Sequence, residues 1–377
     1  MEWKTWPRYF SRTVFADESL IAGAKAMLES QSRECVAHDL GICAMDFSPD
    51  SNRFASASED ETVKIWCTRD WQVTRSFASQ NGLNSAVIFS HDGRFIAVAE
   101  TDCVLIREVV TGNIVQRLGL PSSEFPAQKL RFNFDSSRLA CVLAAEYTCD
   151  SQIIEWEVSK SQPRTQVSFR EFVCSISFSP QGGLIASTYD ADFGGRIYRL
   201  RDITAEKSLR EIDLSKFSAG GVPLNSPDRE VIVLGNRCYG SSVQAISAAG
   251  DLLFTVPAIP SSTPIVSFAG DTSMLAITQS GVDEASTRLA LFAADGRLIR
   301  EFAGASPVSQ ILFSRDGDLL IAMSAMRSSA GVWRVSDGTF LAKSAPHCRV
   351  GRISPDGRWF VSGHVSLRVS DLTGVAR

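Results

Sequence analysis

The sequence predicts an all-β protein built from eight repeats of four short strands, and two observations carry this prediction. First, a turn motif of the form Phe-Ser-x-Asp, or a close variant, recurs along the 377 residues at spacings of 42, 43, 46, 47, 43, 45 and 40. Second, short apolar segments follow each motif and are separated by turns rich in glycine and aspartate. The eight motifs begin at Phe47, Phe89, Phe132, Phe178, Asn225, Phe268, Phe313 and Ile353.

The first repeat shows the pattern most clearly. An apolar segment ends in the turn formers Ser48-Pro49-Asp50, and three further β-rich segments follow, separated by short polar turns. The four predicted strands are Ile42 to Phe47, Phe54 to Ser58, Thr62 to Trp66 and Gln72 to Phe77.

The later repeats have the same organisation. Each motif leads into a second and a third strand, such as Phe95 to Ala99 and Val104 to Glu108, and most repeats add a fourth strand. A sheet this small cannot bury its faces alone, and a period of 40 to 45 residues is typical of sheets packed in a closed ring. We therefore expect a propeller of eight four-stranded blades, with seven as the alternative if the weak fifth repeat is not a blade.

Residues 1–33 do not match the repeat, and we assign them to an N-terminal arm, with the propeller spanning 34–377. Apolar residues between Asp17 and Gln31 follow helical spacing and predict a short helix. The last repeat has no fourth strand of its own, and an unpaired sheet edge promotes aggregation. We expect an N-terminal segment to complete this blade, with Arg8 to Phe15 as the candidate; the alternative is that the arm binds a partner.

Composition narrows the class of protein. The net charge of −4 argues against nucleic-acid binding through a general basic field, and no apolar run is long enough to span a membrane. Residues 1–10 do not resemble a signal peptide. The nine cysteines are scattered without a C-x-x-C pair, so we expect a reducing, cytoplasmic location. With four dispersed histidines, we expect neither a metal nor a cofactor. The sequence does not indicate an oligomeric state.

The first repeat resembles a WD40 repeat. His38 stands where that family has the histidine of a Gly-His pair, although Ala37 replaces the glycine, and Asp60 and Trp66 match the family's turn aspartate and third-strand tryptophan. The resemblance implies a buried hydrogen-bonded network of these side chains with a second-strand serine, Ser56 or Ser58, of which we take Ser58. It gives His38 and Asp60 a structural role rather than a catalytic one. Other repeats lack most of these residues, so we expect the network to be complete in one blade.

No catalytic motif such as G-x-S-x-G, a P-loop or H-E-x-x-H occurs in the sequence. In WD40 proteins, the turns between second and third strands and the links into each first strand form the top face of the ring. These turns lengthen in later repeats and carry aromatic and arginine side chains, which is the composition of protein interfaces. We therefore predict a non-enzymatic scaffold that binds a partner protein, as a subunit of a larger complex. The predicted contacts are Tyr147, Asp150, Tyr189, Asp192, Phe193, Arg237 and Tyr239, with Phe172, Glu59 and Arg349 at the inner rim.

An alternative function remains open. A propeller enzyme or small-molecule binder would place its ligand in the central channel and would need ionisable side chains on the inner strands. The predicted inner strands offer mostly Ser, Ala, Val and Ile.

Overall fold

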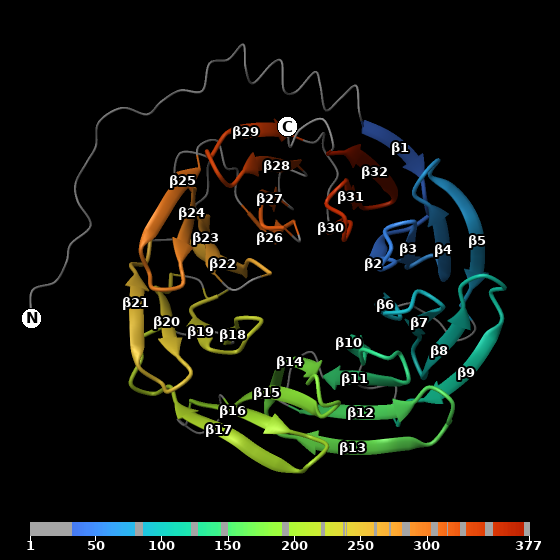
Figure 1. The fold of residues 1–377 in the computed structure, drawn as a ribbon, viewed down its shortest axis with the longest axis horizontal. Helices are drawn as coiled ribbons and strands as arrows, with labels where there is room; N and C mark the ends of the chain where they lie inside the picture. The colour runs from blue at the N-terminus through green and yellow to red at the C-terminus, as the bar shows by residue number, and fades with distance from the viewer. Residues whose placement is uncertain are drawn as a thin grey trace, which may run out of the picture.

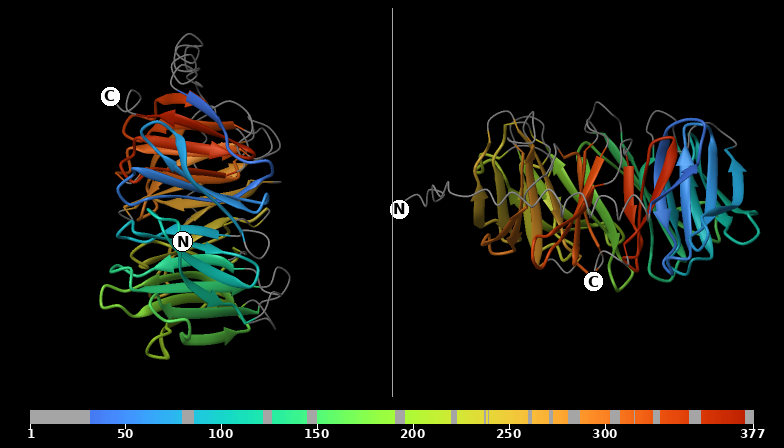
Figure 2. Two further views of the ribbon diagram at one scale, coloured as in Figure 1. Left: turned by 90° about the vertical axis from the view of Figure 1, so that its right-hand side faces the viewer. Right: turned by 90° about the horizontal axis from the view of Figure 1, so that it is seen from above.

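The computed structural model describes residues 32–79, 86–121, 127–144, 150–190, 196–219, 223–236, 238, 240–259, 262–270, 273–280, 287–302, 308–314, 316–324, 329–343 and 350–372. Within these ranges the chain forms thirty-two β-strands and no helix. The strands pair into eight antiparallel sheets of four strands each. The sheets stand around a common centre as the blades of a closed ring (Figure 1), and side views show a ring wider than it is tall (Figure 2).

The predicted fold class and the eight blades are therefore confirmed. In blades 1 to 7, the strands run outwards from the centre in chain order (Figure 1). Blades 1 to 4 comprise β2 (Ile42–Phe47), β3 (Arg53–Ser58), β4 (Thr62–Cys67) and β5 (Gln72–Ala78); β6 (Ala86–Phe89), β7 (Phe95–Ala99), β8 (Cys103–Glu108) and β9 (Ile114–Gly119); β10 (Ala127–Phe132), β11 (Arg138–Ala144), β12 (Ser151–Glu157) and β13 (Pro163–Phe169); and β14 (Phe172–Phe178), β15 (Leu184–Asp190), β16 (Ile197–Asp202) and β17 (Lys207–Asp213).

The second half of the ring follows the same plan. Blade 5 has an innermost strand of only two residues, which explains why its repeat is weak in the sequence. Blades 5 to 7 comprise β18 (Leu224–Asn225), β19 (Val231–Leu234), β20 (Val243–Ser247) and β21 (Leu252–Val256); β22 (Thr263–Phe268), β23 (Met274–Ser280), β24 (Arg288–Ala293) and β25 (Leu298–Phe302); and β26 (Gln310–Phe313), β27 (Leu319–Ser324), β28 (Ser329–Arg334) and β29 (Phe340–Lys343).

Blade 8 joins the two ends of the chain. Its inner three strands are β30 (Val350–Ile353), β31 (Trp359–Gly363) and β32 (Ser366–Asp371), and its outermost strand is β1 (Ser32–Val36). β1 pairs antiparallel with β32, from Ser32 opposite Ser370 to Val36 opposite Ser366 (Figure 1). An N-terminal segment thus closes the ring as expected, but the assignment of that strand to Arg8–Phe15 is wrong. That segment and the predicted helix lie outside the described residues.

The recurrent turn motif has a local physical cause. In blade 1 the Ser48 hydroxyl donates to Asp50 (2.6 Å) and accepts the backbone N–H of Arg53 (2.9 Å), which fixes both ends of the turn. The residue after the aspartate adopts a left-handed conformation, as at Ser51 (φ 60°) and Gly357 (φ 73°), which explains why glycine often follows the aspartate. Equivalent Ser–Asp bonds recur in blades 2, 5, 7 and 8, at Ser90–Asp92, Ser226–Asp228, Ser314–Asp316 and Ser354–Asp356.

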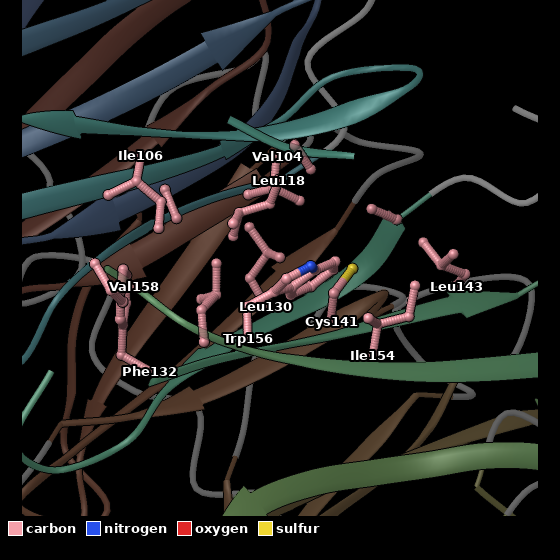
Figure 3. Close-up of a cluster of buried hydrophobic side chains, with 14 residues drawn as sticks. Val104, Ile106, Leu118, Leu130, Phe132, Cys141, Leu143, Ile154, Trp156 and Val158 are labelled. Carbon is pink, nitrogen blue, oxygen red and sulfur yellow. The ribbon is translucent and has the colours of Figure 1, made fainter. Parts of the chain in front are cut away.

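The hydrophobic core lies between neighbouring blades rather than inside one. The cluster in Figure 3 joins Val104, Ile106 and Leu118 of blade 2 to Leu130 and Trp156 of blade 3. Similar clusters occupy other blade interfaces, including the one between blade 8 and blade 1. Because each blade depends on both neighbours to cover its faces, the ring is stable only when it is closed.

Candidate functional site: a structural histidine network, a partly described top face and a charged centre

The first candidate site is a buried polar network inside blade 1. His38, 2% exposed, lies in the link between β1 and β2, and its Nε2 is 2.8 Å from the Ser56 hydroxyl. The Trp66 indole N–H donates to the same hydroxyl over 3.0 Å. On the other side of the imidazole ring, His38 Nδ1 lies 2.9 Å from Asp60 Oδ2. The network therefore joins β3, β4 and the turn between them to the link that enters the blade.

The network fixes the protonation state of its histidine. A carboxylate only accepts hydrogen bonds, so Nδ1 carries the proton towards Asp60, and Nε2 accepts the Ser56 hydroxyl proton. Ser56 then accepts from Trp66, and every group is satisfied by a neutral imidazole. Burial lowers the pKa of His38, and the opposing effect of the Asp60 carboxylate does not outweigh it. The His38 and Asp60 side chains are thus hydrogen-bonded to groups of blade 1 and of the link that enters it.

Asp60 is held as a carboxylate. Burial raises the pKa of Asp60, but hydrogen bonds from the Thr62 hydroxyl (2.7 Å) and from the N–H groups of Asp39 and Thr62 outweigh it and lower the pKa to about 2. Thr62 is a network member that the sequence analysis missed. Its position two residues after the turn aspartate Asp60 could have indicated it.

The choice of Ser58 as the network serine is wrong. Ser58 lies two residues further along β3, where its hydroxyl donates to the backbone oxygens of Leu40 and Gly41 and accepts the N–H of Asp60. Ser56 and Ser58 are both buried and lie on the same face of β3. Ser56 lies opposite Lys64, within hydrogen-bond distance of both the Trp66 indole and the His38 imidazole, whereas Ser58 lies at the turn, so Ser56 is the serine that bridges the two rings.

Blade 3 shows that a tryptophan at this position does not by itself complete the network. Trp156 is fully buried at the position of Trp66, and its indole nitrogen has no hydrogen-bond partner within the described parts of the chain. Cys141 in β11 takes the place of Ser56, as the strand registers show. Burial raises the pKa of the Cys141 thiol, so this residue packs as an apolar side chain.

The predicted top-face cluster is only partly described. Tyr189 is not an exposed contact residue: it belongs to β15, is 5% exposed and packs in the core between blades 4 and 5. Phe172 pairs with Tyr189 across the strands and is half-buried against the same core. Glu59 is half-buried in its turn, and Asp150 is exposed. The remaining predicted contacts, Tyr147, Asp192, Phe193, Arg237, Tyr239 and Arg349, lie outside the described residues.

A small pocket of about 320 Å³ opens at the top edge of blade 3. Its lining runs from Asp150 to Gln152 at the start of β12 and from Ser168 to Arg170 at the end of β13. Next along the chain, the Glu171 carboxylate accepts hydrogen bonds from Arg199 (2.6 Å) and Arg201 (2.9 Å). This ion network, which the sequence analysis did not identify, fixes the link that leads into Phe172.

Charged side chains gather at the centre of the ring. Asp46, Arg131 and Arg352 each precede the last residue of an innermost strand, in blades 1, 3 and 8. Arg131 and Arg352 are exposed to solvent, and each donates to the backbone oxygen of its own preceding residue. Lys129 donates to two backbone oxygens of β14, at Val173 and Cys174. The expectation of mostly small and aliphatic inner-strand residues missed this charged group.

Asp46 also ties blade 1 to blade 2, because its carboxylate accepts the backbone N–H of Phe89 over 2.8 Å. Burial raises the pKa of Asp46 to about 6, although the Phe89 N–H, Arg352 and Arg131 all favour the ionised form. Replacing Asp46 by alanine removes the acceptor of a buried N–H, so we expect a loss of about 1–3 kcal/mol in the free energy of unfolding. Asparagine keeps an acceptor and should restore most of this loss.

The pH dependence of Asp46→Asn follows from the sign of the shift. A carboxyl group whose pKa is raised in the folded state stabilises the fold at low pH, and this contribution disappears as pH rises through about 6. Denaturant titrations at pH 5 and pH 8 should show the asparagine variant gaining stability relative to wild type at the higher pH. An equal difference at both pH values would contradict the burial of a titrating carboxyl group.

The ring of eight four-stranded blades, with its histidine and aspartate used inside a blade, defines a repeat propeller. The WD40 family model, described as "WD domain, G-beta repeat", matches residues 29–67. The first repeat of the chain is therefore similar to a WD40 repeat, and the described strands form an eight-bladed β-propeller. WD40 propellers generally mediate interactions between proteins.

Relatives match part of this chain. "Protein hir1" of Schizosaccharomyces pombe is 26% identical over 201 residues, which are 48% of this chain and 21% of that protein. "WD repeat-containing protein SL1-17" of Schistosoma mansoni is 26% identical over 170 residues, 44% of this chain and 52% of that protein. The chain thus spans about a fifth and about half of these relatives.

Among solved structures, the crystal structure of the computationally designed Ika8 protein superposes with a TM-score of 0.65. The two chains are 17% identical, and the match covers 90% of this chain and 98% of that one. At this identity the likeness concerns the fold alone. No helix within the described parts of the chain is long and apolar enough to cross a membrane.

Proposed function

We propose that this protein is a non-enzymatic scaffold that binds a partner protein through the top face of the propeller, as a subunit of a larger complex in the cytoplasm. The pocket at the top edge of blade 3 carries this proposal, because it presents Asp150, Gln152 and Arg170 on strand ends held by the ring. Polar groups on rigid elements lose little conformational entropy when a partner binds, which favours recognition at such a site.

The arrangement next to the pocket supports the same face. Two arginines form ion pairs with the Glu171 carboxylate, so the link between β13 and β14 keeps its conformation without a ligand. Phe172 follows directly and offers a half-buried ring beside this polar surface. A mixture of fixed charge and partly exposed aromatic surface is typical of the centre of a protein interface.

The test is quantitative affinity capture from native cells with wild-type bait and with an Asp150→Ala/Arg170→Ala bait. We expect the double variant to recover about tenfold less of a specific co-purifying protein, since two charged contacts are worth at least ~1.4 kcal/mol together. Arg297→Ala, which changes an exposed arginine on blade 6, should capture as wild type does. Equal recovery by the double variant, with an unchanged melting temperature, would exclude this pocket as the partner site.

A ligand held at the centre of the ring is the second candidate, and the exposed guanidinium groups of Arg131 and Arg352 favour it. An Arg131→Ala/Arg352→Ala bait distinguishes the two functions in the same experiment. Under the scaffold proposal this variant keeps its partner. Loss of the partner from this variant, with retention by Asp150→Ala/Arg170→Ala, would favour the centre of the ring.

A further inference from the structure

The bottom face of the propeller carries the turns between first and second strands, and most of these turns present an aspartate. The aspartates are Asp50, Asp92, Asp135, Asp228, Asp316 and Asp356, in blades 1, 2, 3, 5, 7 and 8. Blade 4 differs: Gln181 stands at this position, and the Ser179 hydroxyl accepts the N–H of Gly183 without an aspartate partner. The acidic rim of the bottom face is therefore interrupted at blade 4.

A groove of about 760 Å³ lies at this interruption. Blade 4 supplies Gln181 and Asp202 to its lining, and the neighbouring blades supply three arginines. Arg138 and Arg164 come from blade 3, at the start of β11 and near the start of β13, and Arg229 comes from the first turn of blade 5. We call this feature the blade-4 groove.

Arg138 is held in place in the groove. Its guanidinium donates to the buried Glu155 carboxylate (2.7 Å) and to the backbone oxygen of Gly182, and it lies over the Phe178 ring. The buried Glu155 carboxylate therefore compensates the positive charge of Arg138. Asp202 is a second nearby carboxylate, and Glu157, which pairs with Lys160, also acts on Arg138 and Arg164. Three arginines and one lysine therefore face three acidic groups, which leaves a net positive charge at the groove.

Arg229 occupies an unusual position. It adopts a left-handed conformation (φ 65°), at the turn position where blades 2, 7 and 8 have glycine. Burial lowers the pKa of the Arg229 guanidinium, so its positive charge is only partly solvated. The Asp202 carboxylate accepts the N–H of Ala205 in its own turn. A negatively charged ligand in the groove would compensate the charge of Arg229.

Apolar surface borders the groove. Leu209, 48% exposed, is part of the groove lining on β17. An exposed leucine beside arginines gives an apolar side chain of a partner a surface to pack on.

We propose that the blade-4 groove binds an acidic segment of a partner protein, whose carboxylates face Arg138, Arg164 and Arg229 while a neighbouring apolar side chain packs on Leu209. Charge complementarity selects this occupant, since the turn aspartates of blades 1, 2, 3, 5, 7 and 8 repel acidic chains, whereas blade 4 has Gln181 at the same position. The site lies on the face opposite to the pocket of the proposed function, so the two are tested independently.

The experiment measures binding of a short fluorescein-labelled peptide of Asp and Glu around one central Phe to the purified full chain, by fluorescence anisotropy. Arg164→Glu/Arg229→Glu should weaken binding by at least ~10-fold, because each lost contact involves charged groups. Gln181→Asp restores the aspartate found in the other blades, so it should fold normally and weaken binding ~3- to 10-fold by repulsion. Leu209→Ala should weaken binding, and added salt should weaken it in wild type.

Arg297→Glu, which reverses a charge on blade 6, is the matched control and should bind as wild type does. A peptide with Asn and Gln in place of the acidic residues should not bind. Affinity unchanged in both Arg164→Glu/Arg229→Glu and Gln181→Asp would overturn the proposal. A peptide that binds only when phosphorylated, or inorganic phosphate that binds equally well, would overturn the assignment to a carboxylate-bearing segment.

Discussion

Deletion of residues 1–36, which removes β1, is expected to lower the free energy of unfolding by about 3–5 kcal/mol and to make the protein aggregate. β1 pairs with β32 over five residue pairs, and each net backbone hydrogen bond contributes about 1 kcal/mol. The deletion also exposes the edge of β32 to pairing with other chains. Denaturant titration followed by tryptophan fluorescence, with light scattering for aggregation, measures both effects.

The matched control deletes residues 1–15, which removes Arg8–Phe15 but keeps Ser32–Val36. Every described strand remains in this variant, so its unfolding transition should match that of the full chain. If the shorter deletion destabilised the ring as strongly as the longer one, the closing role of β1 would be refuted.

Replacement of His38 by alanine should cost about 2–4 kcal/mol of stability. The change leaves the Ser56 hydroxyl and the Asp60 carboxylate without the ring that joins them, and buried polar groups without partners are strongly unfavourable. Ser56→Ala should cost somewhat less but should shift the indole N–H resonance of Trp66, which donates to Ser56. Ser58→Ala should leave that resonance unchanged, because Ser58 contacts the backbone of the link instead.

The pH dependence of stability provides a second readout of His38. Its pKa is lowered in the folded state, so the unfolded chain takes up the proton first, and stability falls as pH drops below the ordinary histidine value of 6.5. Asp60, with a pKa lowered to about 2, causes a further loss below 3.8. His38→Gln should remove the first loss and keep the second; a variant with the wild-type profile near pH 6 would contradict the neutral histidine.

Most of the fold was predictable because one local interaction repeats. In five blades a serine that binds an aspartate two residues later follows the innermost strand, and related turns follow at the same spacing in the others, so these turns count the blades. Blade 5 kept its Ser226–Asp228 turn although its innermost strand is only two residues long. The turn residues therefore identified blade 5, whereas its hydrophobic periodicity did not.

The closing strand was misassigned for a physical reason. An outermost strand is held mainly by backbone hydrogen bonds, and β1 reads Ser-Arg-Glu-Cys-Val with no fully buried side chain. The aromatic residues of Arg8–Phe15 suggested a strand, but a blade edge does not require apolar side chains. Composition therefore could not locate this strand, whereas the pairing of β1 with β32 does.

The positions of the site residues could not be predicted in the same way, because they depend on strand register and on contacts between repeats that are far apart in the sequence. Tyr189 lies at the boundary of β15 and its turn, and pairing with Phe172 and Tyr198 directs its side chain into the core. Ser56 and Ser58 differ only in their level along one strand. Asp46, Arg131 and Arg352 are far apart in the sequence and face one another only when the ring closes, so no local pattern predicted them.

The antiparallel closure of blade 8 has a mechanical consequence. Ser32, the first residue of β1, lies opposite Ser370, near the end of β32, so the described chain ends leave the ring side by side. A tensile load applied through both ends would act on this pair first and would unzip the two strands one residue pair at a time. Under such a load the propeller would therefore open in blade 8, by separation of β1 from β32.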